Sequence, residues 1–181
     1  MLKDNSLLLF QGDSITDTGR TGSADPSVSL GEGYPAKIAA KLAERGIKVI
    51  NRGISGNRIV DVYARIKADI INLKPDYMSL LIGVNDVWHD YEAIPNGVTT
   101  AKFEKIYNML IEEIFEALPN MKLMLLEPFV LKGARTTTHE KHEDFYSVLR
   151  PLVEEKAAVA RSIAEKYKLP FVELQARFDE R

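Results

Sequence analysis

The sequence contains no cysteine among its 181 residues. Disulfide bonds, thiolate nucleophiles and cysteine-based zinc sites are therefore excluded. No apolar run approaches the ~20 residues that a membrane-spanning helix needs. The first residues also lack the long apolar stretch and small-residue cleavage site of a secretory signal. We therefore expect a cytoplasmic protein that has no membrane partner.

An excess of charge of one sign is also missing. The chain has 24 Lys and Arg residues against 26 Asp and Glu residues, and its formal net charge is −2. Nucleic-acid-binding domains normally carry a basic surplus, so nucleic acid is not an expected partner. The length fits one domain, residues 1–181, with a full hydrophobic core. Whether copies of the chain form a homo-oligomer stays open.

Short apolar runs alternate with segments of helical periodicity along the whole chain. Strands are predicted at residues 7–10, 47–50, 77–82, 122–126 and 171–174. Helices are predicted at residues 34–45, from 59 to about 70, at 103–118, and from about 150 to 167. This alternation predicts an α/β fold in which helices cover both faces of a parallel sheet.

Three short polar segments directly follow the first three predicted strands. They are Gly-Asp-Ser-Ile at 12–15, Ile-Ser-Gly-Asn at 54–57 and Gly-Val-Asn-Asp at 83–86. The carboxyl ends of parallel strands meet at one edge of a sheet, where ligands of open α/β folds bind. That edge would bring together the Ser14 hydroxyl, the Gly56 N–H and the Asn85 amide. A hydroxyl beside two such donors can attack an ester carbonyl and stabilise its oxyanion.

Each of these residues also has an ordinary structural explanation. Ser14 is suited to capping a helix, Gly56 to a turn with positive φ, and Asn85 to a local Asx turn. Taken singly, each is better explained by structure than by catalysis. Their occurrence in order after successive strands favours the catalytic interpretation.

With these three segments the chain resembles the SGNH hydrolases, also called the GDSL esterase/lipase family, over essentially its whole length. The resemblance implies a three-layer α/β/α sandwich with a flavodoxin-like, five-stranded parallel sheet. It implies that Ser14 is the nucleophile and that the Ser14 N–H, Gly56 and Asn85 form the oxyanion hole. It implies no metal and no organic cofactor. The lipase pattern Gly-x-Ser-x-Gly is absent around Ser14.

The family's fourth motif, Asp-x-x-His, has no match near residue 181, where Asp179 is followed by Glu180 and Arg181. We therefore expect the chain to lack a C-terminal catalytic segment and a last helix. The same spacing occurs at 86–89 (Asp-Val-Trp-His), but there it overlaps the third motif. No catalytic histidine or triad aspartate is assigned. Among the three histidines, His89 is the best candidate to line the site.

Two further histidines and two arginines fit a surface or structural role better than a catalytic one. His139 and His142 fall in a polar stretch that does not form His-Glu-x-x-His. Arg20 and Arg58 are weak candidates for contacting an anionic or sugar substrate.

Asp13 and Trp88 are candidate substrate-binding residues. Asp13 adjoins Ser14, but the resemblance implies that it holds the loop. Trp88 would offer a flat apolar face to a sugar ring, or would pack under its loop. Segments 54–57 and 85–88 resemble the carbohydrate-esterase branch of the family, which includes acetylxylan esterases. The polar loops around the site also favour a small acyl group on a polar alcohol, such as an acetylated sugar or oligosaccharide.

Other functions remain open at this stage. The chain is also consistent with a non-catalytic carbohydrate-binding relic of the same fold, or with a lysophospholipase or thioesterase of the family. A flavodoxin-like nucleotide binder is disfavoured, because no phosphate-binding Gly-Lys-Ser/Thr signature occurs.

Overall fold

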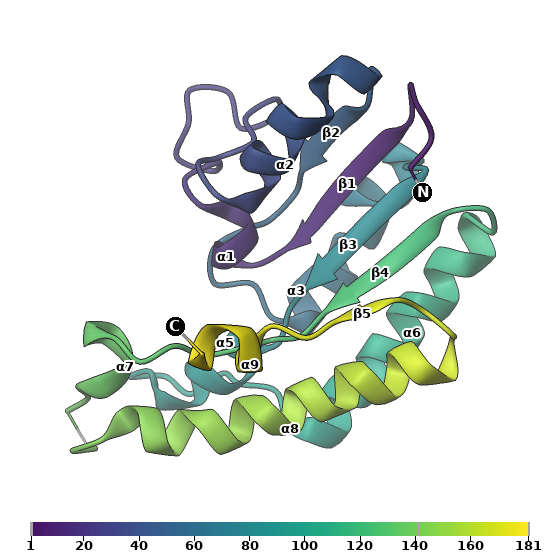
Figure 1. The fold of residues 1–181 in the computed structure, drawn as a ribbon. Coiled ribbons are helices and arrows are strands. Elements are labelled where there is room, and N and C mark those ends of the chain that lie inside the picture. The colour runs from purple at the N-terminus through teal and green to yellow at the C-terminus, as the bar shows by residue number, and fades with distance from the viewer. Residues whose placement is uncertain (1, 141, 181) are drawn as a thin grey trace.

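The computed structural model describes residues 2–140 and 142–180. Helices and strands alternate from end to end (Figure 1). The strands are β1 (Leu7–Gly12), β2 (Lys48–Asn51), β3 (Tyr77–Leu81), β4 (Lys122–Leu126) and β5 (Phe171–Val172). The helices are α1 (Ser14–Asp17), α2 (Tyr34–Leu42), α3 (Ile59–Ala64), α4 (Ile66–Asp69), α5 (Val84–Trp88), α6 (Thr100–Ala117), α7 (Ala134–Thr137), α8 (Phe145–Lys166) and α9 (Gln175–Asp179). Short 3-10 turns occupy Ala43–Arg45, Ile71–Leu73 and His89–Tyr91.

The five strands form one parallel sheet in the order β2-β1-β3-β4-β5. Gly12 at the end of β1 lies opposite Leu81 at the end of β3, and Leu81 lies opposite Leu126 at the end of β4. The carboxyl ends of these three strands are therefore level. Asn51 at the end of β2 lies opposite Phe10 of β1. The segments that follow β1, β2 and β3 therefore emerge at one edge of the sheet, as the sequence predicts, and the segment after β4 joins them there.

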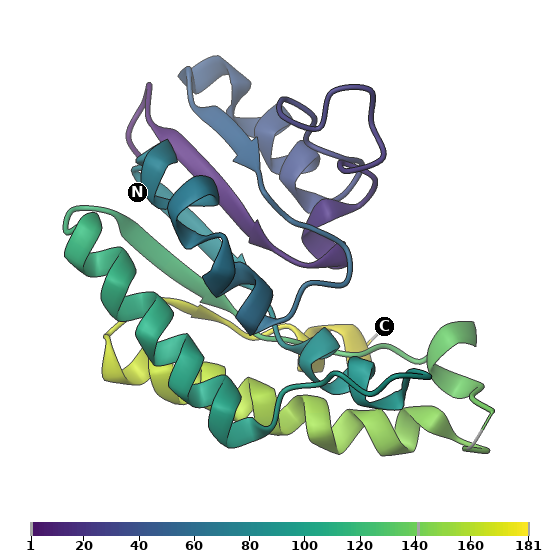
Figure 2. The ribbon, with the colours of Figure 1, turned by 180° about the vertical axis from the view of Figure 1, so that it is seen from behind.

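Successive side chains of each strand point to opposite faces, which divides the core into two layers. Leu9, Leu80 and Leu125 face the layer built with α3, α6 and α8, all three of which lie on the same side of the sheet (Figure 2). Leu8 and Phe10 face the opposite side, where they pack against α2. The expected three-layer α/β/α arrangement is thus confirmed.

Helix α8 begins at Phe145, five residues before the predicted start at residue 150. Proline is normally unfavourable in a helix interior because it lacks an N–H. Pro151 nevertheless lies inside α8, on the exposed side of the helix. The helix continues through it because Phe145, Leu149 and Val153 form a buried stripe at four-residue spacing. Asp144 caps the start by accepting a hydrogen bond from the Ser147 N–H. The sequence-based start was therefore wrong.

The single helix predicted from residue 59 to about 70 is also wrong in detail. It is divided into α3 and α4 at Arg65, whose φ of −110° and ψ of 15° depart from helical values. The Arg65 guanidinium donates to the Gln11 side chain, to the Asn57 side chain and to the Arg52 carbonyl. These bonds join the end of β1 to the loop after β2. They give a physical reason for the break in the helix.

Two short helices at the ends of β4 and β5 were not predicted. α7 follows β4, and α9 follows β5 at the position where the sequence analysis expected no covering helix. No helix among residues 2–140 and 142–180 combines the length and the apolar character needed to cross a membrane.

Candidate active site

Ser14 is the first residue of α1, and only Asp13 separates it from Gly12 at the end of β1. Its neighbour Asp13 caps the helix, because the Asp13 carboxylate accepts a hydrogen bond from the Ile15 N–H at 3.0 Å. Ser14 is exposed, whereas Asp13 has an exposed fraction of only 1%. The turn therefore presents the serine at the sheet edge and keeps the carboxylate beneath it.

Gly56 lies in the loop after β2 and has a φ of +81°, which favours glycine. The loop is fixed by hydrogen bonds from residues on both sides, the buried Asp17 and the half-buried Arg65. Asp17 accepts a hydrogen bond from the Ser55 N–H at 3.0 Å, and Arg65 holds the Asn57 side chain at 2.8 Å. A Cβ added to Gly56 would have only the His89 imidazole within 4 Å. This side of Gly56 therefore faces open space.

Asn85 lies in the first turn of α5, directly after β3. Its side-chain nitrogen donates to the Asn57 carbonyl at 3.0 Å, which links the second and third loops. An amide carries two N–H donors, so one of them remains for a ligand. Gly83 makes the sharp turn into α5 with a φ of +141°, and a Cβ there would lie 3.0 Å from Pro128.

The three loops meet at a cleft of about 480 Å³. Ser14, Gly56 and Asn85 all line it, so the structure brings together the three residues that the sequence singled out. The Ser14 and Gly56 N–H groups donate to no acceptor within the described part of the chain. A serine hydroxyl and three N–H donors without a partner among the described residues thus belong to residues that line one cleft.

Trp88 and His89 line the same cleft. The Trp88 ring also packs edge-to-face against Phe145, with ring centroids 5.5 Å apart. Trp88 therefore both lines the cleft and packs against the protein, which combines the two placements expected from the sequence. The His89 Nδ1 lies 3.5 Å from a Glu92 carboxylate oxygen. The other ring nitrogen, Nε2, is the atom nearest to the open side of Gly56.

The Asp-x-x-His spacing at 86–89 does not form a catalytic pair. The Asp86 carboxylate is fully buried and accepts hydrogen bonds from the Ile59 N–H at 3.0 and 3.2 Å. The imidazole of His89 faces the cleft and pairs with Glu92 instead. Asp86 therefore holds the backbone at Ile59, and His89 is oriented by Glu92.

Burial raises the pKa of both carboxyls beneath the cleft. Desolvation raises the pKa of Asp13 to about 7. The hydrogen bond from the Ile15 N–H lowers this pKa, but by less than desolvation raises it. Desolvation likewise raises the pKa of Asp86 to about 7, and the nearby Asp13 contributes in the same direction. One Asp13 oxygen is buried without a hydrogen-bond partner. A protonated Asp13 would avoid an unpaired buried charge.

Asp13, Arg20 and Arg58 do not line the cleft. Arg20 is buried and donates two hydrogen bonds to the Gly53 carbonyl. Arg58 pairs with Asp61 at 2.9 Å. The structure therefore gives all three residues a role in holding the loops around the site.

His139 and His142 lie away from the cleft, and both rings stack on Phe145, with centroids 4.4 and 5.7 Å away. They are half-buried, so the expectation of surface histidines was only partly right. The described residues contain no cluster of three or more His, Asp or Glu side chains that could hold a metal ion.

Sequence reasoning missed the opposite wall of the cleft. This wall follows β4 and consists of Phe129, Val130, Leu131, Arg135 and Thr136. Gln175 of α9 holds it in place by exchanging two hydrogen bonds with the Val130 backbone, at 3.0 and 3.1 Å. The position of this segment in the chain was a usable signal, because it follows β4, and β4 ends at the same sheet edge as β1 and β3.

Three comparisons with known proteins agree with this geometry. Residues 10–181 match the GDSL-like lipase/acylhydrolase family. The acetylxylan esterase of Geobacillus stearothermophilus is 35% identical over 180 residues, which cover 96% of this chain and 78% of that protein. A crystal structure of an acetylxylan esterase from the same organism has a TM-score of 0.81 at 34% identity, covering 98% of this chain and 80% of the other.

A structure from Parabacteroides merdae, described as a GDSL-like lipase, has a TM-score of 0.84 at 33% identity and covers 99% of this chain and 82% of the other. The family match spans most of the chain, and the relatives share both sequence and fold with it. The chain therefore belongs to the GDSL-like lipase/acylhydrolase family and is a carboxylic ester hydrolase of the SGNH type.

Proposed function

We propose that the protein removes acetyl groups from a carbohydrate by serine catalysis, with Ser14 as the nucleophile. One observation carries the proposal: Ser14, Gly56 and Asn85 line a single cleft in which the Ser14 and Gly56 N–H groups have no acceptor among the described residues. Unpaired donors that line the same cleft as a hydroxyl match the needs of a tetrahedral oxyanion.

In the proposed reaction the Ser14 oxygen attacks the acetyl carbonyl carbon, and a base takes the serine proton. The oxyanion accepts hydrogen bonds from the Ser14 N–H, the Gly56 N–H and the Asn85 amide. When this intermediate collapses, the sugar alkoxide leaves and takes the proton from the base. Water then attacks the acyl-enzyme, which releases acetate and restores the Ser14 hydroxyl.

The family resemblance implies that this base is a histidine, and we assign the role to none of His89, His139 and His142. His89 shares its loop with the oxyanion donor Asn85, and its Nδ1 faces Glu92. The His139 Nε2 is 3.1 Å from the Tyr91 carbonyl, and His142 stacks on Phe145. The variant His89→Asn tests this assignment, because it should retain most of the acetate release.

The acetyl-carbohydrate substrate is supported by the relatives and by the walls of the cleft. One curated relative, 35% identical to this chain, is an acetylxylan esterase. Trp88 gives the cleft a flat aromatic wall of the kind that packs on sugar rings, while Glu92 and Thr136 add groups that can bond to hydroxyls.

Acetate release from acetylated xylo-oligosaccharides tests the proposal directly. We expect acetate release to depend on Ser14, so that the Ser14→Ala variant loses nearly all the turnover that the wild-type protein shows. Ser162→Ala is the matched control, because Ser162 is an exposed serine on α8 far along the chain from the site. Equal activity of Ser14→Ala and Ser162→Ala would refute the assignment. Sugar binding without acetate release by the wild type would instead indicate a binding relic.

A further inference from the structure

Arg135 carries a charge into the cleft that contains Ser14. Among the residues that the structure describes, it is the one permanent cation that lines this cleft. It belongs to α7, on the wall that follows β4. It is exposed, and within the described part of the chain its guanidinium makes no hydrogen bond and no ion pair. Its N–H donors are therefore open to a ligand in the cleft.

Other arginines around the site are engaged by the protein itself. Arg20 donates two hydrogen bonds to the Gly53 carbonyl, at 3.0 and 2.6 Å. Arg58 pairs with Asp61 at 2.9 Å. These two guanidiniums hold the loops around the site together. Arg135 makes no such bond to the described residues, so its charge remains to act on a ligand.

The turn that carries Arg135 is held in place by hydrogen bonds. The Gly133 N–H donates to the Thr136 hydroxyl oxygen at 2.8 Å, and the Thr136 hydroxyl donates to the Leu131 carbonyl at 2.6 Å. The Thr136 N–H donates to the Gly133 carbonyl at 2.9 Å. The main chain beneath Arg135 is therefore fixed before a ligand binds, which lowers the entropic cost of binding.

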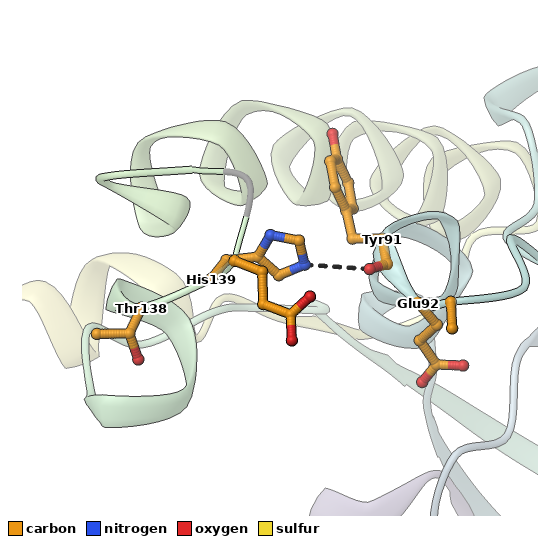
Figure 3. A pocket seen from close by; sticks show the side chains of 6 residues that line it. Tyr91, Glu92, Thr138 and His139 are labelled. Carbon is orange, nitrogen blue, oxygen red and sulfur yellow. Dashed lines mark hydrogen bonds between the residues drawn. The ribbon is translucent and has the colours of Figure 1, made fainter.

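The other ionisable side chains of the cleft belong to the opposite wall. Glu92 and His89 follow α5, and the Glu92 carboxylate lies 3.5 Å from the His89 Nδ1. Figure 3 shows Glu92 across from Thr138, which follows the α7 turn. No ion pair joins Glu92 to Arg135 within the described residues. An anionic ligand is therefore attracted to one wall and repelled by the other, which orients it in the cleft.

A carboxylate is the anion that suits this arrangement best. Its two oxygens match two parallel N–H donors of a guanidinium. Glu92 would repel a phosphate dianion about twice as strongly as a carboxylate monoanion. The proposed reaction places the acetyl group at Ser14, so the carboxylate has to belong to the alcohol part of the ester. A ligand that fills the cleft also excludes water from the guanidinium, which strengthens the pairing.

We infer that Arg135 is a specificity-determining residue that binds a carboxylate on the alcohol part of the ester. The protein then favours acidic acetyl esters over neutral ones of the same shape. This inference rests on the proposed deacetylation at Ser14 and adds a charge preference to it.

Two acetyl esters that differ in charge test the inference. 4-Acetoxybenzoate carries a carboxylate, and 4-acetoxybenzamide carries a neutral amide of nearly the same shape. We expect the ratio of their kcat/KM values, acidic over neutral, to fall about fivefold in Arg135→Gln, equivalent to about 1 kcal/mol. The fall should be smaller in Arg135→Lys, which keeps the charge but not the planar fork. Added salt should lower the wild-type ratio, because it screens the pairing.

Lys132→Gln is the matched control. Lys132 is exposed, lies three residues before Arg135 and does not line the cleft, so its variant removes the same charge from the same segment. Its ratio of kcat/KM values should equal that of the wild type. A ratio that Arg135→Gln leaves unchanged, or an equal fall in Lys132→Gln, would overturn the inference.

A binding measurement separates this failure from failure of the proposed function. Ser14→Ala protein is titrated with 4-acetoxybenzoate in ligand-observed NMR, with and without Arg135→Gln. Binding that weakens in the double variant supports the role of Arg135 even if no variant releases acetate. No binding of 4-acetoxybenzoate, or binding that Arg135→Gln leaves intact, contradicts it.

Discussion

Replacing Asp13 with asparagine isolates the energetic effect of the carboxyl buried beneath Ser14. Asparagine has nearly the same shape, and its side-chain oxygen can still accept the hydrogen bond from the Ile15 N–H that caps α1. What the variant removes is the ionisable group. Asp13 does not line the cleft, so we expect Asp13→Asn to keep most of the ester hydrolysis.

The size of the effect follows from the pKa of Asp13, which burial raises from 3.8 to about 7. Between these two pH values the folded protein holds a proton that the unfolded chain releases, so the free energy of unfolding falls as the pH rises. Each pH unit is worth about 1.4 kcal/mol. Integrated from pH 5 to pH 8, the deprotonation of Asp13 alone lowers the free energy of unfolding of the wild type by about 3 kcal/mol.

Urea unfolding at pH 5, 6, 7 and 8 measures this difference. We expect the loss of stability across the range to be about 3 kcal/mol smaller in Asp13→Asn than in the wild type. In Tm this corresponds to about 6–12 °C for a chain of this size. Asp86 also titrates near pH 7, so part of the pH dependence should remain in the variant. Asp4→Asn is the control, because the Asp4 side chain is 65% exposed. An Asp13→Asn curve as steep as that of the wild type would refute the reasoning.

Three further substitutions test the site and its support. Asn85→Ala should lower kcat by about 10²–10³ with little change in KM, as expected for loss of an oxyanion donor, whereas Asn72→Ala on the exposed surface should change neither. Gly83→Ala should destabilise the fold by about 1–3 kcal/mol in urea unfolding, because φ is +141° and the new Cβ would lie 3.0 Å from Pro128. Trp88→Ala should raise KM for an acetylated xylo-oligosaccharide about 2- to 10-fold and leave the hydrolysis of a small aryl acetate nearly unchanged.

Most of the fold could be predicted because its periodicities are strong. The continuous apolar run of β3 and the three- and four-residue spacing within α6 each identify an element without tertiary information. The start of α8 could not be predicted, because Pro151 is a local stop signal that the buried stripe on the same helix overrides. The break between α3 and α4 depends on Arg65, whose partners come from two other segments.

The candidate site was predictable for a related reason. Parallel strands bring their carboxyl ends together whatever their separation in the sequence, so Ser14, Gly56 and Asn85 could be grouped from strand positions alone. The burial of Asp13 could not be read from its position beside Ser14. The wall formed by residues 129–131 carries ordinary apolar side chains, which have no catalytic signature.

Intact mass after treatment with a serine-reactive phosphonate tests most directly whether Ser14 is an activated nucleophile. The wild type, Ser14→Ala and the control Ser162→Ala are treated in parallel and weighed. We expect one phosphonate adduct on the wild type and on Ser162→Ala, and none on Ser14→Ala. An adduct that survives in Ser14→Ala, or a wild-type protein that takes up no phosphonate, would contradict the assignment of Ser14 as the nucleophile of this esterase.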